Sequence, residues 1–258
     1  MADDIPEVAA QPVKADHEKI ASRALILLRE GRYAEAIACY DELLNRFPNY
    51  VDGWYNKGIA LGEHLQKYEE AIKCYDKGLS INPRDIDMWH NKGKALYCLG
   101  RFAESIECFD RVLQLNPHYR ISLEGKAASL NNMGHYKESE AVAEHILEMY
   151  PPGNIKTWKA LSVLSMALNN QGKYKKAIDG ANKAIALNPN DDGIWETKGA
   201  ALASLGRYRE ALTCLEESLR LNPKNKTAQD TKAKVLDVLQ EFWGPGDQPP
   251  TAQVQPKK

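Results

Sequence analysis

The sequence is poor in the features that carry catalysis, membrane insertion or disulfide cross-linking. It has five cysteines, an odd number, and no CxxC pair among them. No apolar run approaches the ~20 residues that a helix needs to span a bilayer. The formal net charge is only −1, so the charge balance gives no argument for a nucleic-acid groove or an anionic membrane surface. We therefore expect neither a nucleic-acid partner nor a membrane.

Motifs for chemistry are also missing. The six histidines do not form HExxH or an equivalent ligand spacing, and no Walker loop, GxSxG or GxGxxG follows a strand. The sequence thus predicts no catalytic residues, no metal site and no cofactor, and the chain is expected not to be an enzyme. The N-terminal stretch MADDIPEVAAQPVKAD is acidic and lacks the basic-then-apolar order of a signal peptide, which predicts a cytoplasmic protein.

A repeat is the dominant feature that the sequence does contain. One aromatic recurs at Tyr33, Tyr68, Phe102, Tyr136, Tyr174 and Tyr208. One proline recurs at Pro48, Pro83, Pro117, Pro151, Pro189 and Pro223. Both markers give the same spacing of about 34 residues, which is typical of a repeat architecture.

Each unit is predicted to form two helices. With positions numbered from the start of a unit, positions 4, 8 and 11 share a helical face, as in Trp89, Gly93 and Leu96. A Gly-Arg-Phe turn follows at Gly100, since glycine commonly ends a helix. The second helix ends before Pro117, because the residue preceding proline avoids helical geometry.

These Trp, Gly, Gly-x-Tyr, Ala and Pro positions resemble the motif of the tetratricopeptide repeat (TPR). The resemblance covers six repeats within 17–225, at 17–50, 51–85, 86–119, 120–153, 158–191 and 192–225. It implies an all-α fold, a right-handed α-solenoid of antiparallel helical hairpins. Residues 226–243 are predicted to form a capping helix, and the polar, proline-containing tails 1–16 and 244–258 are predicted to be disordered.

Three departures from the repeat carry further expectations. Four extra residues lie between the fourth and fifth repeats, within 151–157, and are either an extra helical turn or a hinge. One extra residue in the second repeat, within EHLQKY, is expected to be a loop insertion. Four cysteines share position 23 and are expected to be buried, reduced core residues: Cys39, Cys74, Cys108 and Cys214.

Charges also follow the repeat. Position 7 is basic in five units, at Arg23, Lys57, Lys92, Lys126 and Lys198. Position 25 is acidic in the same five, at Asp41, Asp76, Asp110, Glu144 and Glu216. In the fifth unit both change, to Leu164 and Asn182. This pattern predicts a ladder of ion pairs, within or between neighbouring units, against the alternative of a solvated charge bias.

The resemblance implies that the functional surface is a concave groove lined by the first helices. Positions 2, 5, 6, 9 and 13 point away from the buried face. The candidate peptide-binding residues are Asp52, Tyr55, Asn56, Asp87, His90, Asn91, Lys94, Glu124 and Asn132. An amide such as Asn91 has donors and an acceptor that can hold a peptide backbone. The alternative is that these residues are simply polar groups on a hydrated face.

The predicted function is that of a non-catalytic scaffold or adaptor that binds a peptide segment of a partner protein. One alternative is a co-chaperone with a clamp for an acidic chaperone tail. That clamp resembles basic and amide residues at positions where this chain has Ala21, Leu25, Asn56, Asp87 and Asn91, so only Asn56 fits. The lining leans acidic and favours a neutral or basic peptide. A second alternative is self-association into a homo-oligomer through apolar solenoid ends.

Overall fold

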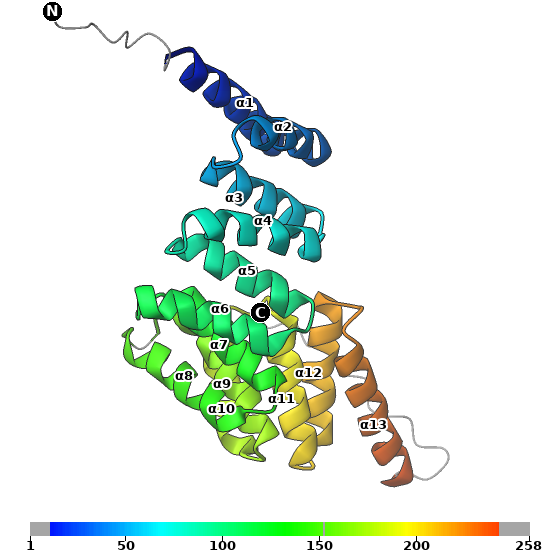
Figure 1. Ribbon diagram of the computed structural model, residues 1–258. Coiled ribbons are helices and arrows are strands. Elements are labelled where there is room, and N and C mark those ends of the chain that lie inside the picture. The colour runs from blue at the N-terminus through cyan, green and yellow to red at the C-terminus, as the bar shows by residue number, and fades with distance from the viewer. Residues whose placement is uncertain (1–10, 152, 243–258) are drawn as a thin grey trace, which may run out of the picture. The chain divides into compact units, whose positions relative to one another are not determined.

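The computed structural model describes residues 11–151 and 153–242 (Figure 1). It divides into two compact units, 1–125 and 126–258, and the division falls inside helix α7 (Arg120–Asn132). Every regular element in the described ranges is helical, and each unit is a stack of antiparallel helical hairpins. The predicted all-α fold is thus confirmed. In the part of the chain that the structure describes, no helix is long and apolar enough to cross a membrane.

The first unit contains three helical hairpins and the start of a fourth. Its elements before α7 are α1 (Gln11–Arg29), α2 (Tyr33–Arg46), α3 (Val51–Ile59), η1 (Ala60–His64), α4 (Tyr68–Ile81), α5 (Ile86–Cys98) and α6 (Phe102–Leu115). Figure 1 shows α1–α2, α3–α4 and α5–α6 as successive pairs.

The second unit continues the pattern and ends on a single helix. Its elements after α7 are α8 (Tyr136–Glu148), η2 (Ile155–Thr157), α9 (Trp158–Asn170), α10 (Tyr174–Leu187), α11 (Asp192–Ser204), α12 (Tyr208–Leu221) and α13 (Lys226–Phe242). Helix α13 packs on α12 and buries Ala228, Val235 and Leu239, as expected of a cap.

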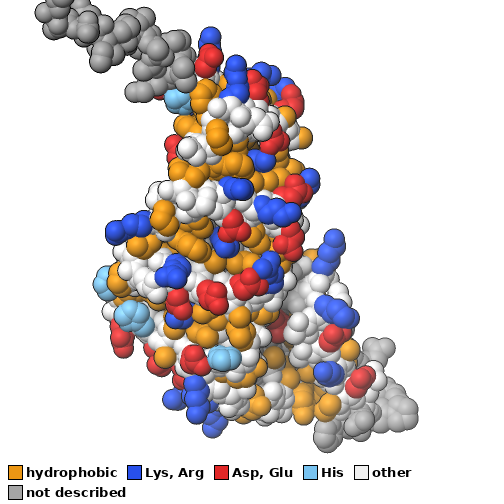
Figure 2. Space-filling view, viewed as in Figure 1, with side chains coloured by type: hydrophobic (Ala, Val, Ile, Leu, Met, Phe, Trp, Pro, Cys, Tyr) orange, Lys and Arg blue, Asp and Glu red, His pale blue; other side chains and the backbone are white. Residues whose placement is uncertain are grey.

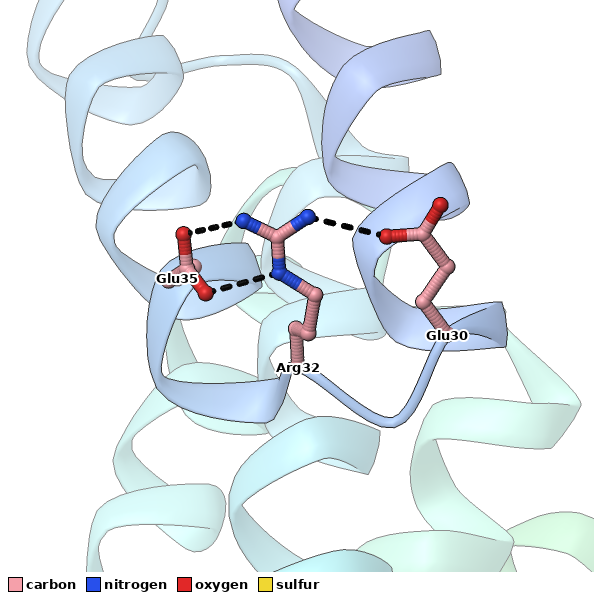
Figure 3. Close-up of polar contacts among 3 residues, drawn as sticks. All are labelled: Glu30, Arg32 and Glu35. Carbon is pink, nitrogen blue, oxygen red and sulfur yellow. Dashed lines mark hydrogen bonds and ion pairs between the residues drawn. The ribbon is translucent and has the colours of Figure 1, made fainter.

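In the first hairpin the chain reverses through a glycine and an arginine–glutamate clamp. Gly31 has φ +75°, a left-handed conformation that costs glycine little. Next to it, Arg32 donates two hydrogen bonds to Glu35, at 2.8 and 2.6 Å, and one to Glu30 at 3.0 Å (Figure 3). Glu35 lies in the first turn of α2, where a negative charge complements the helix dipole. The clamp therefore fixes the start of the second helix.

Small residues let the two helices of a hairpin approach closely. A Cβ on Gly93 of α5 would lie 2.8 Å from Phe109 Cε1 of α6, and one on Gly199 of α11 would lie 2.8 Å from Leu215 Cγ of α12. Positions 8 and 24 of the repeat thus meet directly. A methyl group on either glycine would have to displace the side chain at position 24.

The tryptophan at position 4 holds the loop that precedes its own repeat. Its indole N–H donates to the backbone oxygen of the repeat proline, from Trp54 to Pro48 at 2.8 Å and from Trp89 to Pro83 at 2.9 Å. Gln229 of α13 makes the same contact to Pro223, at 2.8 Å. Where position 4 carries an indole or amide donor, it therefore joins its helix to the preceding repeat.

The predicted ion-pair ladder is confirmed for two of its pairs, which run between repeats, and a third pair of the same kind involves Lys232, which was not predicted. The cation at position 7 reaches back to the acid at position 25 of the preceding repeat. The measured pairs are Lys57–Asp41 at 2.5 Å, Lys92–Asp76 at 2.6 Å and Lys232–Glu216 at 3.0 Å. The last pair extends the pattern into α13, which thereby occupies the place of the first helix of a seventh repeat.

The fifth repeat interrupts the ladder twice, because its residues at positions 7 and 25 are both uncharged. Leu164 stands where a cation would meet Glu144 of the fourth repeat. Asn182 stands where an acid would meet Lys198 of the sixth, and the Lys198 ammonium lies instead over the Trp195 ring, 5.5 Å from its centroid.

The extra residue of the second repeat is not a loop insertion, so this prediction was wrong. Helix α3 continues into the π-helical turn η1, and Gln66 adopts φ 55° where the other turns have glycine. The Lys67 N–H closes the turn on the oxygen of Leu61, whereas Arg101 closes its turn on Leu96, one residue nearer. The insertion is absorbed by widening the helix, which keeps its backbone hydrogen-bonded.

The extra residues before the fifth repeat form an additional turn. The 3₁₀ turn η2 runs directly into α9, and Asn154 caps it by accepting from the Lys156 N–H at 2.9 Å. Trp158 packs in one apolar cluster with Leu147 of α8. Of the two alternatives, the extra turn matches the structure, and the division between the compact units lies elsewhere, inside α7.

The predicted tails differ in part from the structure. Helix α1 begins at Gln11, so residues 11–16 are helical and the tail predicted at 1–16 is too long. Residues 1–10 and 243–258, which include Trp243 of the predicted cap and the predicted C-terminal tail, lie outside the described residues.

Candidate functional site

The candidate site lies on the face that α3, α5 and the start of α7 share in the first unit. Tyr55 of α3 and Asn91 of α5 meet there, with the Asn91 amide donating to the Tyr55 hydroxyl at 3.4 Å. The two residues occupy positions 5 and 6 of successive repeats, so corresponding faces of successive first helices lie side by side. Outward-facing side chains of separate repeats thereby become one surface.

Asp87 connects this surface on α5 to the residue just before α7. The Tyr119 hydroxyl, just before α7, donates to Asp87 Oδ1 of α5 at 2.9 Å. Burial, helped by this hydrogen bond to a carboxylate, raises the pKa of Tyr119 to about 12. Burial and the charge of Asp87 also raise the pKa of Tyr55. Both phenols therefore stay protonated at neutral pH and keep a hydroxyl donor on the surface.

A pocket of about 270 Å³ opens beside this pair of helices. Its lining consists of Gly62, Glu63, Tyr68, Tyr75, Asn91, Lys94, Ala95 and Cys98. Lys94 of α5 reaches Glu63 of η1 at 2.6 Å across its mouth, and the ion pair remains about half exposed. The pocket thus combines an aromatic wall with both donors and acceptors.

Two predicted residues are not available to a ligand, which corrects the candidate set. His90 is 9% exposed: its Nδ1 lies 2.8 Å from Ser122 Oγ and its ring packs on Phe109. Glu124 is 7% exposed and ion-pairs with Arg120 one turn earlier. Each of these buried side chains has a polar partner, as buried polar groups in proteins generally do.

The other candidates lie at the surface. Asp52 is exposed, and Asn56 is half-buried and donates to the Asp52 backbone oxygen one turn earlier, at 2.9 Å. Asn132 is exposed, donates to the Ala128 oxygen at 2.9 Å, and belongs to the second unit. The structure therefore brings together Tyr55, Asp87, Asn91 and Lys94, with Asp52 and Asn56 on the same helix as Tyr55.

Three tyrosines at this surface were not among the predicted residues. Tyr68 and Tyr75 come from the second helix of the repeat, and Tyr119 from the loop before α7. A pattern confined to the first helix cannot find them. The signal for Tyr68 was its place among the recurring aromatics, which the sequence shows as a marker of the period.

The surface offers hydrogen-bonding groups, aromatic packing and one exposed thiol, that of Cys98. Among the residues that the structure describes, no three His, Cys, Asp or Glu side chains are grouped so that they could hold a metal ion. On the side of the molecule drawn in Figure 2, lysine and arginine side chains lie among aspartate and glutamate side chains. Such a surface is suited to recognising another polypeptide.

Comparisons with known proteins agree with this geometry. Tetratricopeptide repeat families match residues 22–86, 86–119, 159–191 and 193–225, together more than half of the chain. A search of curated proteins finds no match.

Solved structures share the fold at low sequence identity. A tetratricopeptide repeat protein from Parabacteroides merdae is 17% identical, with a TM-score of 0.74 and 86% of each chain covered. A thermophilic TPR protein from Thermus thermophilus is 18% identical, with a TM-score of 0.59, covering 72% of this chain and 98% of that one. YrrB, described as a TPR protein with an unusual peptide-binding site, is 15% identical, with a TM-score of 0.54, covering 75% and 97%. From the repeated hairpins, their glycine and tryptophan contacts and these matches, we conclude that the chain belongs to the tetratricopeptide repeat family.

Proposed function

We propose that this chain is a non-catalytic adaptor that binds an extended peptide segment of a partner protein. The binding surface is the shared face of α3, α5 and the start of α7, which we call the α3–α5 groove and define by Asp52, Tyr55, Asn56, Asp87, Asn91 and Lys94. The observation that carries the proposal is the contact between Tyr55 and Asn91, which joins two repeats into one continuous polar surface.

Tetratricopeptide repeats are protein–protein interaction modules, which supports the general class of function. The related structure YrrB carries the description of a peptide-binding site, which supports a peptide as the ligand. The pocket beside Asn91 and Lys94 has room for a side chain of such a peptide. Its aromatic wall favours an apolar or amphipathic side chain.

Asn91 is the residue best placed to hold the peptide backbone. One of its amide hydrogens points to Tyr55, and the amide has a further hydrogen and an oxygen with which to meet a backbone C=O and N–H. Pairs of this kind hold a main chain without regard to its sequence. Selectivity then comes from the pocket and from the surrounding charge.

The charge of the groove favours a neutral or basic peptide. Lys94 is neutralised by Glu63, and Glu124 by Arg120, so Asp52 and Asp87 leave the groove acidic. A lysine or arginine of the peptide would be attracted to these carboxylates, whereas an acidic chaperone tail would be repelled. The arrangement therefore argues against the co-chaperone alternative.

Peptide display on the purified full chain tests the proposal. Selected peptides are synthesised, and their affinity is measured by fluorescence anisotropy for the wild type and for Asn91→Ala, Asp87→Asn and Lys94→Ala. We expect enrichment of basic peptides and at least a roughly tenfold loss of affinity for Asn91→Ala, the cost of about one well-made hydrogen-bonded contact.

A matched control is Lys73→Ala on the outer side of α4, where the side chain is exposed and outside the groove. Its affinity should equal that of the wild type. Peptides that bind all groove variants as tightly as the wild type would show that the groove is not the binding surface.

A further inference from the structure

Helix α1 is the first helix of its repeat. In later repeats, the corresponding outer face of the first helix is covered by the repeat that precedes it. In the other repeats, positions 3, 7 and 10 of the first helix meet the second helix before it. Ala95 at position 10 of α5 shares an apolar cluster with Ile72 of α4, and Ala201 of α11 with Ile178 of α10. At position 3, Met88 of α5 packs against Gly78 of α4.

In the five later repeats the residues at positions 3 and 10 are buried, whereas in α1 they are exposed. Position 10 is small and buried in the five later repeats, at Ala60, Ala95, Ser129, Ala167 and Ala201. Position 3 is buried in the same repeats, at Gly53, Met88, Ser122, Ala160 and Ile194. In α1, position 3 is the exposed Lys19, and position 10 is Ile26, which is 54% exposed.

An open hollow of about 730 Å³ marks this face. Its lining consists of Asp16, Glu18, Lys19, Ser22, Arg23, Ile26, Leu27, Glu30 and Arg32. Helix α1 is the first helix of the described residues, which therefore include no preceding second helix that could supply an acid to the ladder cation Arg23. Ile26 is the exposed apolar side chain of a lining that is otherwise mostly charged, and it stands where the five later repeats have a small, buried residue.

The charges along this stripe are complementary to themselves in one orientation. Reading along α1, Lys19 and Arg23 are basic and Ile26 is apolar, and the acidic Glu30 follows directly after the helix. Glu30 also accepts a hydrogen bond from Arg32 at 3.0 Å, so Lys19 of a second copy would share this carboxylate with Arg32. The place occupied by a preceding second helix accepts a helix that runs antiparallel to α1. If that helix is α1 of a second copy, Lys19 faces Glu30 of the second copy, and the same pair forms again on the other side of the two-fold axis.

We propose that α1 docks antiparallel on α1 of a second copy of this chain and forms a two-fold symmetric dimer. At its centre, Ile26 packs against the methylene groups of Arg23 of the second copy. A parallel arrangement is disfavoured, because it would set Lys19 against Lys19 and Glu30 against Glu30. This surface is separate from the α3–α5 groove, so dimerisation and peptide binding are independent.

One helix face from each copy makes a small interface, so the dimer should be weak and sensitive to salt. We expect a dissociation constant on the order of 10 to 100 µM at low salt. Analytical ultracentrifugation of the full chain from about 1 to 300 µM measures it. A wild type that stays monomeric over this range overturns the proposal.

Charge exchange gives the decisive test, because each single variant repels itself and the two attract each other. Lys19→Glu alone sets acid against acid, and Glu30→Lys alone sets base against base, so each should weaken its own dimer at least about tenfold. An equimolar mixture of the two variants should form a heterodimer. The double variant Lys19→Glu/Glu30→Lys should dimerise within about threefold of the wild type. Failure of both rescues overturns the proposed pairing.

Two further variants distinguish the α1 face from other surfaces through which the chain could dimerise. Ile26→Asp should abolish the dimer while circular dichroism shows an unchanged helical spectrum, since Ile26 is largely exposed in the monomer. Asn91→Ala, in the groove, should leave the dimer intact. A dimer that survives Ile26→Asp would lie on another surface and would overturn the proposal.

Discussion

The Lys92 ammonium of α5 lies 2.6 Å from the Asp76 carboxylate of α4, and 5.3 Å from the centroid of the Trp89 ring on its own helix. One cation thereby contacts both the preceding repeat and the tryptophan that holds the intervening loop. Its side chain is 19% exposed and that of Asp76 is 51% exposed, so the pair is partly shielded from water.

A double-mutant cycle with Lys92→Met and Asp76→Asn should give a coupling energy of about 0.5–1 kcal/mol, because partial shielding reduces screening by salt. Urea unfolding of the four proteins measures it. The matched control is the pair Lys67–Glu70, at 3.3 Å and with both side chains more than half exposed, which should couple more weakly. Equal coupling in the two cycles would contradict the shielding argument.

Gln66→Gly should stabilise the protein by roughly 0.5–1 kcal/mol. Gln66 holds φ 55°, a conformation that glycine adopts without a steric penalty. The reciprocal variant Gly100→Gln, at φ +74°, should cost a similar amount, because the turn would then carry a side chain in the same strained region. Thermal unfolding followed by circular dichroism compares the two, and a loss of stability in Gln66→Gly would count against the strain.

Gly93→Ala should destabilise the protein by about 1–3 kcal/mol, because the added methyl would lie 2.8 Å from Phe109 Cε1. The control is Gly193→Ala in α11, where the nearest group is the Asp191 carboxylate oxygen at 3.3 Å. That change should be close to neutral. Chemical denaturation measures both, and similar effects from the two variants would argue against tight packing at position 8.

A single thiol should react rapidly in the native protein. Cys98 is exposed, whereas Cys39, Cys74, Cys108 and Cys214 are buried. Burial raises the pKa of Cys74 and of Cys108 to about 11, so little thiolate forms at pH 8. Ellman's reagent at pH 8 should titrate one fast thiol, absent in Cys98→Ser, and all five after unfolding. Two or more fast thiols in native protein would contradict the predicted core.

Glu140 should contribute stability that is lost in acid. Hydrogen bonds from Lys173 and Gln171 lower its pKa, with Lys173 making the larger contribution. A carboxyl whose folded pKa lies below its unfolded value stabilises the fold above that unfolded value, about 4.3, and loses the effect as pH falls through the folded pKa.

Glu140→Gln should therefore cost roughly 1 kcal/mol at pH 7, and this cost should shrink as the pH falls below the unfolded pKa of about 4.3. The control is Glu144→Gln on the same helix, an exposed ladder position whose counterpart in the next repeat is Leu164 rather than a cation, and it should change stability little at either pH. Thermal melts at the two pH values measure the difference. A pH-independent cost of Glu140→Gln would show that its charge is not involved.

The amino-acid sequence by itself determined the repeat, the helical hairpins and the residues at their seams. A period of about 34 residues in tyrosine and proline can only be met by one hairpin stacked on the next, and Trp89, Gly93 and Phe109 lie where that stacking requires them. The ladder, too, was visible as matched charges at positions 7 and 25, because local spacing fixes which face of a helix a residue occupies.

Only the tertiary structure decided what each of those faces meets. It buried His90 and Glu124 beside Ser122 and Arg120, although helical spacing alone had placed them outward. It added Tyr119 to the surface from a loop, and it absorbed the insertion near Gln66 into a π-helical turn. These outcomes depend on how neighbouring helices pack. They also depend on the relative free-energy costs of a buried polar group, a widened helix and a loop. No single stretch of sequence specifies either the packing or these costs.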